Sequence, residues 1–166
     1  AIEWFSKAAE CQDMERIEAQ YMLGICHYFG YGVAEDAQQA LQWFEKASRY
    51  GHDPAEYMAG CCYYFENNLE QDYEQAVNWF EKAAEQGHAK AIYMLGLCYR
   101  DGTGVSEDHE QAVYFLTKSA EQDEPEAQHL LGALYYDGEV VEENDERAVY
   151  WFEKASEYEL AHAQYM

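Results

Sequence analysis

The 166 residues include 33 Asp and Glu against 10 Lys and Arg, a formal net charge of −23, yet 49% are hydrophobic and 16% aromatic. So much apolar content excludes an acidic disordered tail, because the chain can bury a core. The charge argues against binding nucleic-acid phosphates or anionic membranes, both of which need clustered cations, and no apolar run is long enough to span a bilayer.

A pattern of 36 residues repeats along most of the chain. Glycine marks it at Gly24, Gly60, Gly96 and Gly132, and an alanine lies five residues before each: Ala19, Ala55, Ala91 and Ala127. A second block follows in the same phase, an aromatic or apolar pair trailed by lysine: Trp43-Phe44 with Lys46, Trp79-Phe80 with Lys82, Phe115-Leu116 with Lys118, and Trp151-Phe152 with Lys154. Such a period indicates a repeat architecture.

Residues 1–18 carry another copy of the second block, Trp4-Phe5 with Lys7, so we expect the second helix of a preceding repeat there. Four full repeats are predicted to follow, and residues 163–166 are expected to begin a truncated fifth. Because the chain lacks an initiator Met and stops inside a helical pattern, we expect a fragment or a processed form. The predicted full repeats are 19–54, 55–90, 91–126 and 127–162.

Each repeat is predicted to form two helices. In the second repeat the first helix spans 55–65, with Asp53 as its N-cap and Pro54 at the first helical position. First helices end at glycine turns, such as 29–33 and 101–105. Second helices begin at capping pairs: Asp36 with Gln39, Asp72 with Gln75, and Asp108 with Gln111. Their apolar stripe in the first repeat is Ala40, Trp43, Phe44 and Ala47.

Neither helix can bury its apolar face alone, so stacked helix pairs are expected. The pattern Ala-x-x-x-Leu-Gly-x-x-Tyr-x-x-Gly-x-Gly-Val-x-x-Asp, followed by Ala-x-x-Trp-Phe-x-Lys-Ala, resembles the Sel-one-like repeat family, a relative of the 34-residue tetratricopeptide repeat. The resemblance covers nearly the whole chain. It implies an all-α, right-handed superhelix (solenoid) of helix-turn-helix repeats that serves as a protein-interaction scaffold. The chain departs from the pattern at His27, at Ala59, and at Glu66 and Asn68, which predict a remodelled second turn.

The face of the first helices opposite the core is the candidate partner-binding surface. At 100° per residue, the positions two, six and nine residues after the repeat alanine lie opposite the buried face, and the resemblance implies that they line a concave groove. Between each repeat alanine and the ninth position after it, only Glu56 and Arg100 are charged. The predicted groove residues are Tyr21, Ile25, Tyr28, Tyr57, Cys61, Tyr64, Tyr93, Leu97, Arg100, His129, Ala133 and Tyr136.

Two interpretations of the groove tyrosines stay open, packing between adjacent helices and binding. Binding is favoured for the two rows together, because tyrosine is enriched at interfaces. The negative charge is then expected on the second helices, the turns and the terminal segments, as in residues 139–146. There it forms either a solvated face or an acidic rim that attracts a basic partner.

Cysteine and histidine indicate little chemistry. Cys26, Cys62 and Cys98 share one repeat position, filled by Leu134 in the fourth repeat, so small buried apolar residues are expected there. Secreted relatives, the resemblance implies, carry a second cysteine per repeat. Its absence here favours reduced thiols and the cytoplasm, with the periplasm or secretion open because the N-terminus is expected to be missing. The six histidines lack metal-ligand spacing, and no catalytic motif is present, so we expect no metal, no cofactor and no enzyme.

These features predict a non-catalytic adaptor that binds a protein or peptide in an aromatic groove with an acidic surround. A basic partner fits the charge, whereas nucleic acid, membrane insertion and a small-molecule cofactor are not expected. One alternative is an inhibitor or immunity protein that neutralises a basic effector such as a toxin, a role that the resemblance implies for some bacterial members. A remote alternative is a weak hydrolase of the kind reported for cysteine-rich relatives.

Overall fold

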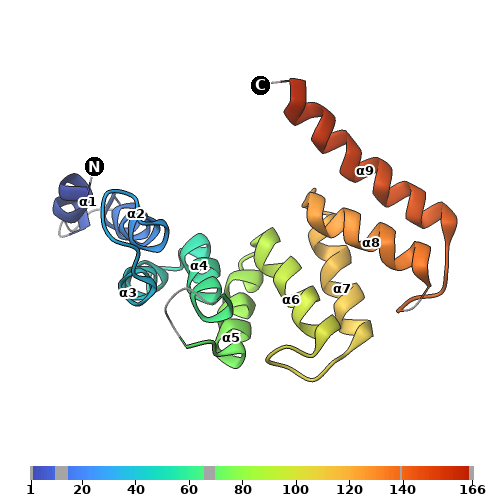
Figure 1. The fold of residues 1–166 in the computed structure, drawn as a ribbon, viewed down its shortest axis with the longest axis horizontal. Coiled ribbons are helices and arrows are strands. Elements are labelled where there is room, and N and C mark those ends of the chain that lie inside the picture. Colours follow the sequence, from blue (N-terminus) through green and yellow to red (C-terminus); the bar gives the residue numbers. More distant parts are fainter. Residues whose placement is uncertain (1, 10–14, 66–69, 139, 165–166) are drawn as a thin grey trace. The chain divides into compact units, whose positions relative to one another are not determined.

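The computed structural model describes residues 2–9, 15–65, 70–138 and 140–164 and is helical wherever it is regular (Figure 1). The chain divides into two compact units, Ala1–His88 and Ala89–Met166. The predicted all-α class is confirmed. Unit 1 holds α1 (Ile2–Ala9), α2 (Glu15–Phe29), α3 (Ala37–Ser48), α4 (Asp53–Tyr64) and α5 (Tyr73–Glu85). Unit 2 holds α6 (Ala89–Asp101), α7 (His109–Ala120), α8 (Pro125–Asp137) and α9 (Asp145–Gln164).

Within each unit, every helix packs against the next one in the sequence, as stacked helix pairs require. The stripe predicted for the second helices is the core of unit 1: Phe44, Ala40 and Ala47 are fully buried on α3. Trp43 is half-buried and packs against a cluster that includes Leu23 of its own repeat and Ala9 of α1. Helix α3 packs against α2 of its own repeat and against α4 of the next repeat. None of the helices described combines the length and apolar content needed to cross a membrane.

The predicted caps of the second helices are confirmed. In each case an aspartate Oδ1 accepts from the backbone N–H three residues later: Asp36 from Gln39 at 2.9 Å, Asp72 from Gln75 at 3.0 Å, and Asp108 from Gln111 at 3.0 Å. The backbone N–H of each aspartate donates back to the first helix, to the carbonyls of His27, Tyr63 and Tyr99. This bond forms in the second repeat too, although the predicted remodelling at Glu66 and Asn68 lies outside the described residues.

The predicted start of α4 is wrong by one residue. His52, not Asp53, is the N-cap, and its Nδ1 accepts from the backbone N–H of Ala55 at 3.2 Å. Asp53 and Pro54 therefore lie inside the first turn. A histidine was not considered as a cap because the usual N-cap residues are Ser, Thr, Asp and Asn.

Candidate partner-binding surface

The tyrosines two positions after the repeat alanine form the first predicted row. In unit 1 they are Tyr21 and Tyr57, both half-buried. The Tyr21 ring lies 6.0 Å from the Phe44 ring, and the Tyr57 ring 6.0 Å from that of Phe80. Each tyrosine thus covers the buried phenylalanine of its own repeat. These side chains therefore pack on the core while part of their surface stays exposed.

A histidine near the end of the same repeat packs on each of these tyrosines. The His52 ring centroid is 4.9 Å from that of Tyr21, and the His88 ring stacks on Tyr57 at 4.8 Å with 19° between the planes. The result is two Tyr–His ring pairs in unit 1. We call the two pairs together the Tyr–His row: Tyr21, His52, Tyr57 and His88.

Local hydrogen bonds orient the histidine in the middle of this row. Because Nδ1 of His52 accepts from the backbone, its Nε2 is free to carry the proton, and Nε2 lies 3.4 Å from Glu18 Oε2. Glu18 is exposed, in the first turn of α2. The Tyr–His row therefore runs beside an acidic side chain that one of its members contacts.

The second predicted row in unit 1 consists of Tyr28 and Tyr64, which are also half-buried. Tyr28 lies 6.5 Å from Phe44 and 4.9 Å from Phe29, and Tyr64 lies 6.1 Å from Phe80 and 5.0 Å from Phe65. Both rows therefore rest on the same two buried phenylalanines. The second row continues into exposed aromatic residues at the turns that follow α2 and α4.

Cys61, which lies between the two rows, was predicted at the surface but is buried. This side chain is only 4% exposed. It hydrogen-bonds Tyr57, and burial raises the pKa of its thiol to about 12. The helical wheel placed Cys61 outside because it treats the helix alone, whereas the neighbouring tyrosines cover this position. Its counterpart Ile25 is half-buried against the core of unit 1.

Unit 2 is less aromatic at the equivalent positions. Tyr93 is half-buried against the core, and its pKa is raised by burial and then by the charge of Glu126. Arg100 pairs with Asp101, Nε to Oδ1 at 2.6 Å, which neutralises the one cation of the predicted groove. His129 is exposed and lies 5.5 Å from the Phe152 ring. The remaining residues are Leu97 and Ala133, both half-buried, and Tyr136, which is 63% exposed.

Two repeat positions carry different charges in unit 1 and unit 2, a difference that the sequence analysis missed. Glu124 occupies the repeat position of His52, and Lys90 occupies that of Glu18. Glu124 is buried, and Lys90 lowers its pKa while burial raises it, to a net value of about 7. The sequence shows this charge difference at the position three residues before the repeat alanine. The residues there are Arg16, His52, His88 and Glu124.

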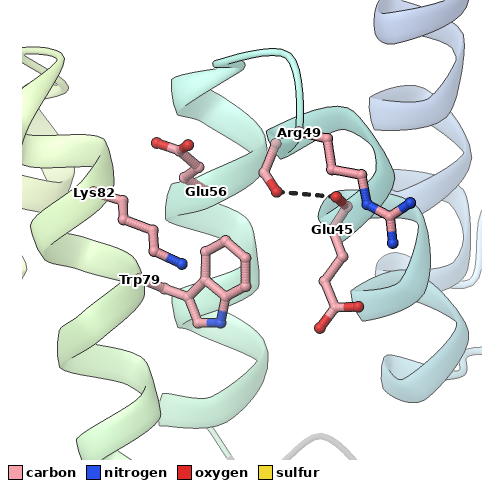
Figure 2. Close-up of a pocket in the computed structure, with 6 residues that line it drawn as sticks. Glu45, Arg49, Glu56, Trp79 and Lys82 are labelled. Atoms are coloured by element: carbon pink, nitrogen blue, oxygen red, sulfur yellow. Dashed lines mark hydrogen bonds between the residues drawn. The ribbon is translucent and has the colours of Figure 1, made fainter.

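A cavity of about 410 Å³ lies on another side of unit 1, between α3, α4 and α5 (Figure 2). Trp79 stands in it, with the Lys82 Nζ 3.9 Å from the centre of its ring, while Glu45 and Arg49 extend from α3. The dashed line joins Ser48 Oγ to the Glu45 carbonyl at 3.0 Å. Its carboxylates and cations balance, and Lys82 already covers one side of the indole, so the cavity offers no distinct ligand chemistry.

No group of three or more His, Cys, Asp or Glu side chains suited to a metal ion occurs in the part of the chain that the structure describes. The cysteines described there, Cys26, Cys61, Cys62 and Cys98, are buried free thiols. Cys26, Cys62 and Cys98 have the small, buried side chains expected at their repeat position.

Comparison with known proteins gives one family. The Sel1 repeat model matches residues 1–13, 17–52, 53–88, 89–124 and 125–157. A protective antigen of uropathogenic Escherichia coli with an SLR fold is 34% identical, with a TM-score of 0.86, over 95% of this chain and 33% of that chain. A Sel1 repeat protein from Oxalobacter formigenes is 32% identical, with a TM-score of 0.86, over 95% of this chain and 63% of that chain.

A more distant structure, an immunity protein from Pseudomonas aeruginosa, shares the fold at 23% identity and a TM-score of 0.63, over 93% of this chain and 56% of that chain. No curated protein matches the chain. The chain spans less than two thirds of the length of the two nearer structures described above.

Proposed function

The chain belongs to the Sel1 repeat family, whose members typically mediate protein–protein interactions, and we propose that it is a non-catalytic scaffold that binds a protein or peptide on the Tyr–His row of unit 1. The observation that carries this proposal is the pairing of Tyr21 with His52 and of Tyr57 with His88, at 4.9 and 4.8 Å. Rings held in this way lose little conformational freedom on binding, and their polar tips can hydrogen-bond a partner.

The charge around the row supports a basic partner. No Lys or Arg occurs between residues 17 and 45 or between 50 and 81, and both stretches contain acidic residues. An acidic surround speeds the approach of a cationic protein and disfavours an anionic one. The second row, Tyr28 and Tyr64, extends the same surface. We assign a secondary role to the unit 2 residues at the predicted positions, which are less aromatic.

A capture experiment with matched variants tests this role. Native lysate is passed over the wild-type chain, over the double variant Tyr21→Ser/Tyr57→Ser, and over Tyr114→Ser, whose tyrosine is 57% exposed on the second helix α7. The proposal expects partners that the wild type and Tyr114→Ser retain and the double variant loses. Tyr21→Phe/Tyr57→Phe keeps the ring packing and controls for loss of fold. Equal capture by the wild type and a folded double variant would refute the row as the binding surface.

An inhibitor or immunity role is a second candidate, favoured by the net charge of −23. Neutralising a basic effector would produce a tight, stoichiometric complex whose association slows steeply as salt rises. An adaptor would bind several ligands more weakly. Titration of a captured partner at two salt concentrations, with its own activity as the readout, separates the two: unaffected activity at saturation excludes the inhibitor.

A further inference from the structure

Four aromatic side chains are exposed at the turns of unit 1. Phe29 and Tyr31 follow α2 and are 50% and 61% exposed; Phe65 and Tyr73 flank the turn after α4 and are 44% and 37% exposed. We call these four residues the turn patch. Phe29 stacks on Tyr31, and Phe65 and Tyr73 both contact Tyr64, so each pair forms a small exposed aromatic surface. Exposed apolar patches on soluble proteins often mark binding sites.

The described backbone around the turn patch is fixed. Gly30, with φ of 70°, allows the N–H of Tyr31 to reach the Cys26 carbonyl at 2.8 Å. Tyr31 then stacks on Phe29, with ring centroids 5.5 Å apart and 23° between the planes. In the second repeat, Tyr73 meets the Tyr64 ring at 5.4 Å. The rings are therefore held in place before any partner arrives.

The repeat fold does not require aromatic residues at these positions. In unit 2 the residue equivalent to Phe29 and Phe65 is Asp101, and the one equivalent to Tyr31 is Thr103. His109 replaces Tyr73, and the next repeat has Asp137 in place of Phe29. Helix pairs form around all of them. A packing role thus does not account for the turn patch.

The acidic residues around the turn patch carry uncompensated charge. Glu35, Glu70 and Glu74 are exposed, and within the described part of the chain they form no hydrogen bond or ion pair through their carboxylates. Asp36 and Asp72 accept helix-capping hydrogen bonds through Oδ1. An apolar segment alone would leave these carboxylates beside it without cations.

Cations already cover two other rings of unit 1, one half-buried and one exposed. Lys46 Nζ lies 3.7 Å from the Trp43 ring centre, and the Arg16 guanidinium lies 4.7 Å from that of Tyr50. No such contact is made to the turn patch among the described residues. We propose that the turn patch binds an arginine-rich segment of a partner protein, with guanidinium groups stacked on its rings and paired with Glu35, Glu70 and Glu74.

This proposal relies on the proposed function only in taking the partner to be a protein, and defined peptides test it. Fluorescent peptides of alternating Arg–Ser, Lys–Ser and Leu–Ser are titrated into the wild type, into the turn variant Phe29→Ser/Tyr31→Ser/Phe65→Ser/Tyr73→Ser, and into Tyr114→Ser. The turn variant is expected to lose at least about tenfold in Arg–Ser affinity, while Tyr114→Ser is unchanged. Lys–Ser should bind the wild type more weakly than Arg–Ser, because the planar guanidinium stacks on rings.

Three outcomes would overturn the proposal. Equal Arg–Ser affinity for the wild type and a folded turn variant would show that the peptide binds the negative charge of the chain in general and not the turn patch. A loss confined to the Leu–Ser peptide, or a loss of self-association in sedimentation, would assign the patch to an apolar segment or to a second copy of the chain. A loss in Tyr21→Ser/Tyr57→Ser but not in the turn variant would refute the turn patch while leaving the proposed function intact. The thermal melt of each variant establishes that it folds.

Discussion

Gly60 on α4 lies against the Phe80 ring of α5 so closely that a Cβ on Gly60 would be 2.5 Å from the ring Cε1. The same relationship recurs one repeat earlier, between Gly24 and Phe44, where the distance would be 2.4 Å. Because Cβ atoms do not approach a neighbour so closely, only glycine lets the two helices of a repeat pack at this distance. The glycine spaced every 36 residues therefore marks the closest contact within each helix pair.

The substitution Gly60→Ala should destabilise the chain although alanine is the better helix former. Alanine favours a helix by about 1 kcal/mol over glycine, but overpacking against the fully buried Phe80 costs about 1–3 kcal/mol. We expect a net loss of up to about 2 kcal/mol in the free energy of unfolding, measured by urea denaturation.

A double-mutant cycle with Phe80→Leu tests the cause. Phe80→Leu alone is destabilising because it leaves a cavity, but it also removes the ring that the methyl group introduced by Gly60→Ala would meet. The cost of Gly60→Ala should therefore shrink in the Phe80→Leu background. If the cost is the same in both backgrounds, the contact between Gly60 and Phe80 is not what selects glycine.

Replacing Glu56 with Gln is expected to stabilise the folded chain. The equivalent residues are Gln20, Ile92 and Gln128, none of them charged, and Gln128 Nε2 donates to the carbonyl of Ala120 at 3.0 Å. Glu56 is buried, and burial raises its pKa from 4.5, against smaller opposing effects of Gln86 and Lys82. The folded state therefore binds the Glu56 proton more tightly than the unfolded state does. This contribution to stability is complete below pH 4.5 and is lost as the pH rises.

Glu56→Gln should accordingly raise the free energy of unfolding by about 1 kcal/mol at pH 7. At low pH, where Glu56 is protonated in both states, the gain should disappear. Urea denaturation at both pH values measures the difference. If the variant is less stable than the wild type at pH 7, then the surroundings of Glu56 stabilise its charged carboxylate.

The described cysteines should react slowly with iodoacetamide in the folded chain. Cys61 and Cys98 are buried, and burial raises the pKa of each thiol to about 12, so almost no thiolate is present at about pH 8. Urea should accelerate their modification by exposing them. Mass spectrometry of each cysteine peptide follows the rates, with Cys11, outside the described residues, scored separately. Rapid modification of Cys98 without denaturant would contradict its burial.

Features set by neighbouring residues could be predicted from the sequence. The 36-residue period, the helix pairs and the aspartate caps, such as Asp72 with Gln75, depend on short-range spacing, and the structure has them. The exception among caps was His52, whose ring nitrogen takes the place of the usual oxygen acceptor. Such a substitution becomes visible only when the helix start is known.

Features that depend on contacts between helices could not be predicted. Cys61 was predicted at the surface, yet it is buried, with Tyr57 of its own helix and Tyr21 of α2 close to it. The tyrosine row was predicted, but not the histidines that pair with it, because Tyr21 on α2 and His52 at the N-cap of α4 are far apart in the sequence. The helical wheel gives the direction of a side chain. It does not give the distance between helices, which decides what covers that side chain.

Glu124 should make the stability of the chain depend on pH between about 4.5 and 7. Its carboxyl is buried at the start of α8, caps no backbone N–H, and hydrogen-bonds Glu126. Burial and this bond raise the pKa of Glu124 to about 7, while Lys90 opposes the rise. The same bond lowers the pKa of Glu126, and Tyr93 interacts with both carboxyls. In the folded state the carboxyl pair therefore shares one proton in this range.

The folded state holds the Glu124 proton more tightly than the unfolded state, so its contribution to stability is complete below about pH 4.5 and is lost as the pH rises through 7. Glu124→Gln keeps a donor towards Glu126 at every pH and should remove this loss. Allowing for solvent screening, we expect the variant to gain about 1 kcal/mol over the wild type between pH 4.5 and 7. Urea denaturation across this range measures the gain, and Glu121→Gln, at an exposed position of the same connection, is the matched control. If the wild type, Glu124→Gln and Glu121→Gln show parallel pH profiles, then Glu124 does not hold the proton.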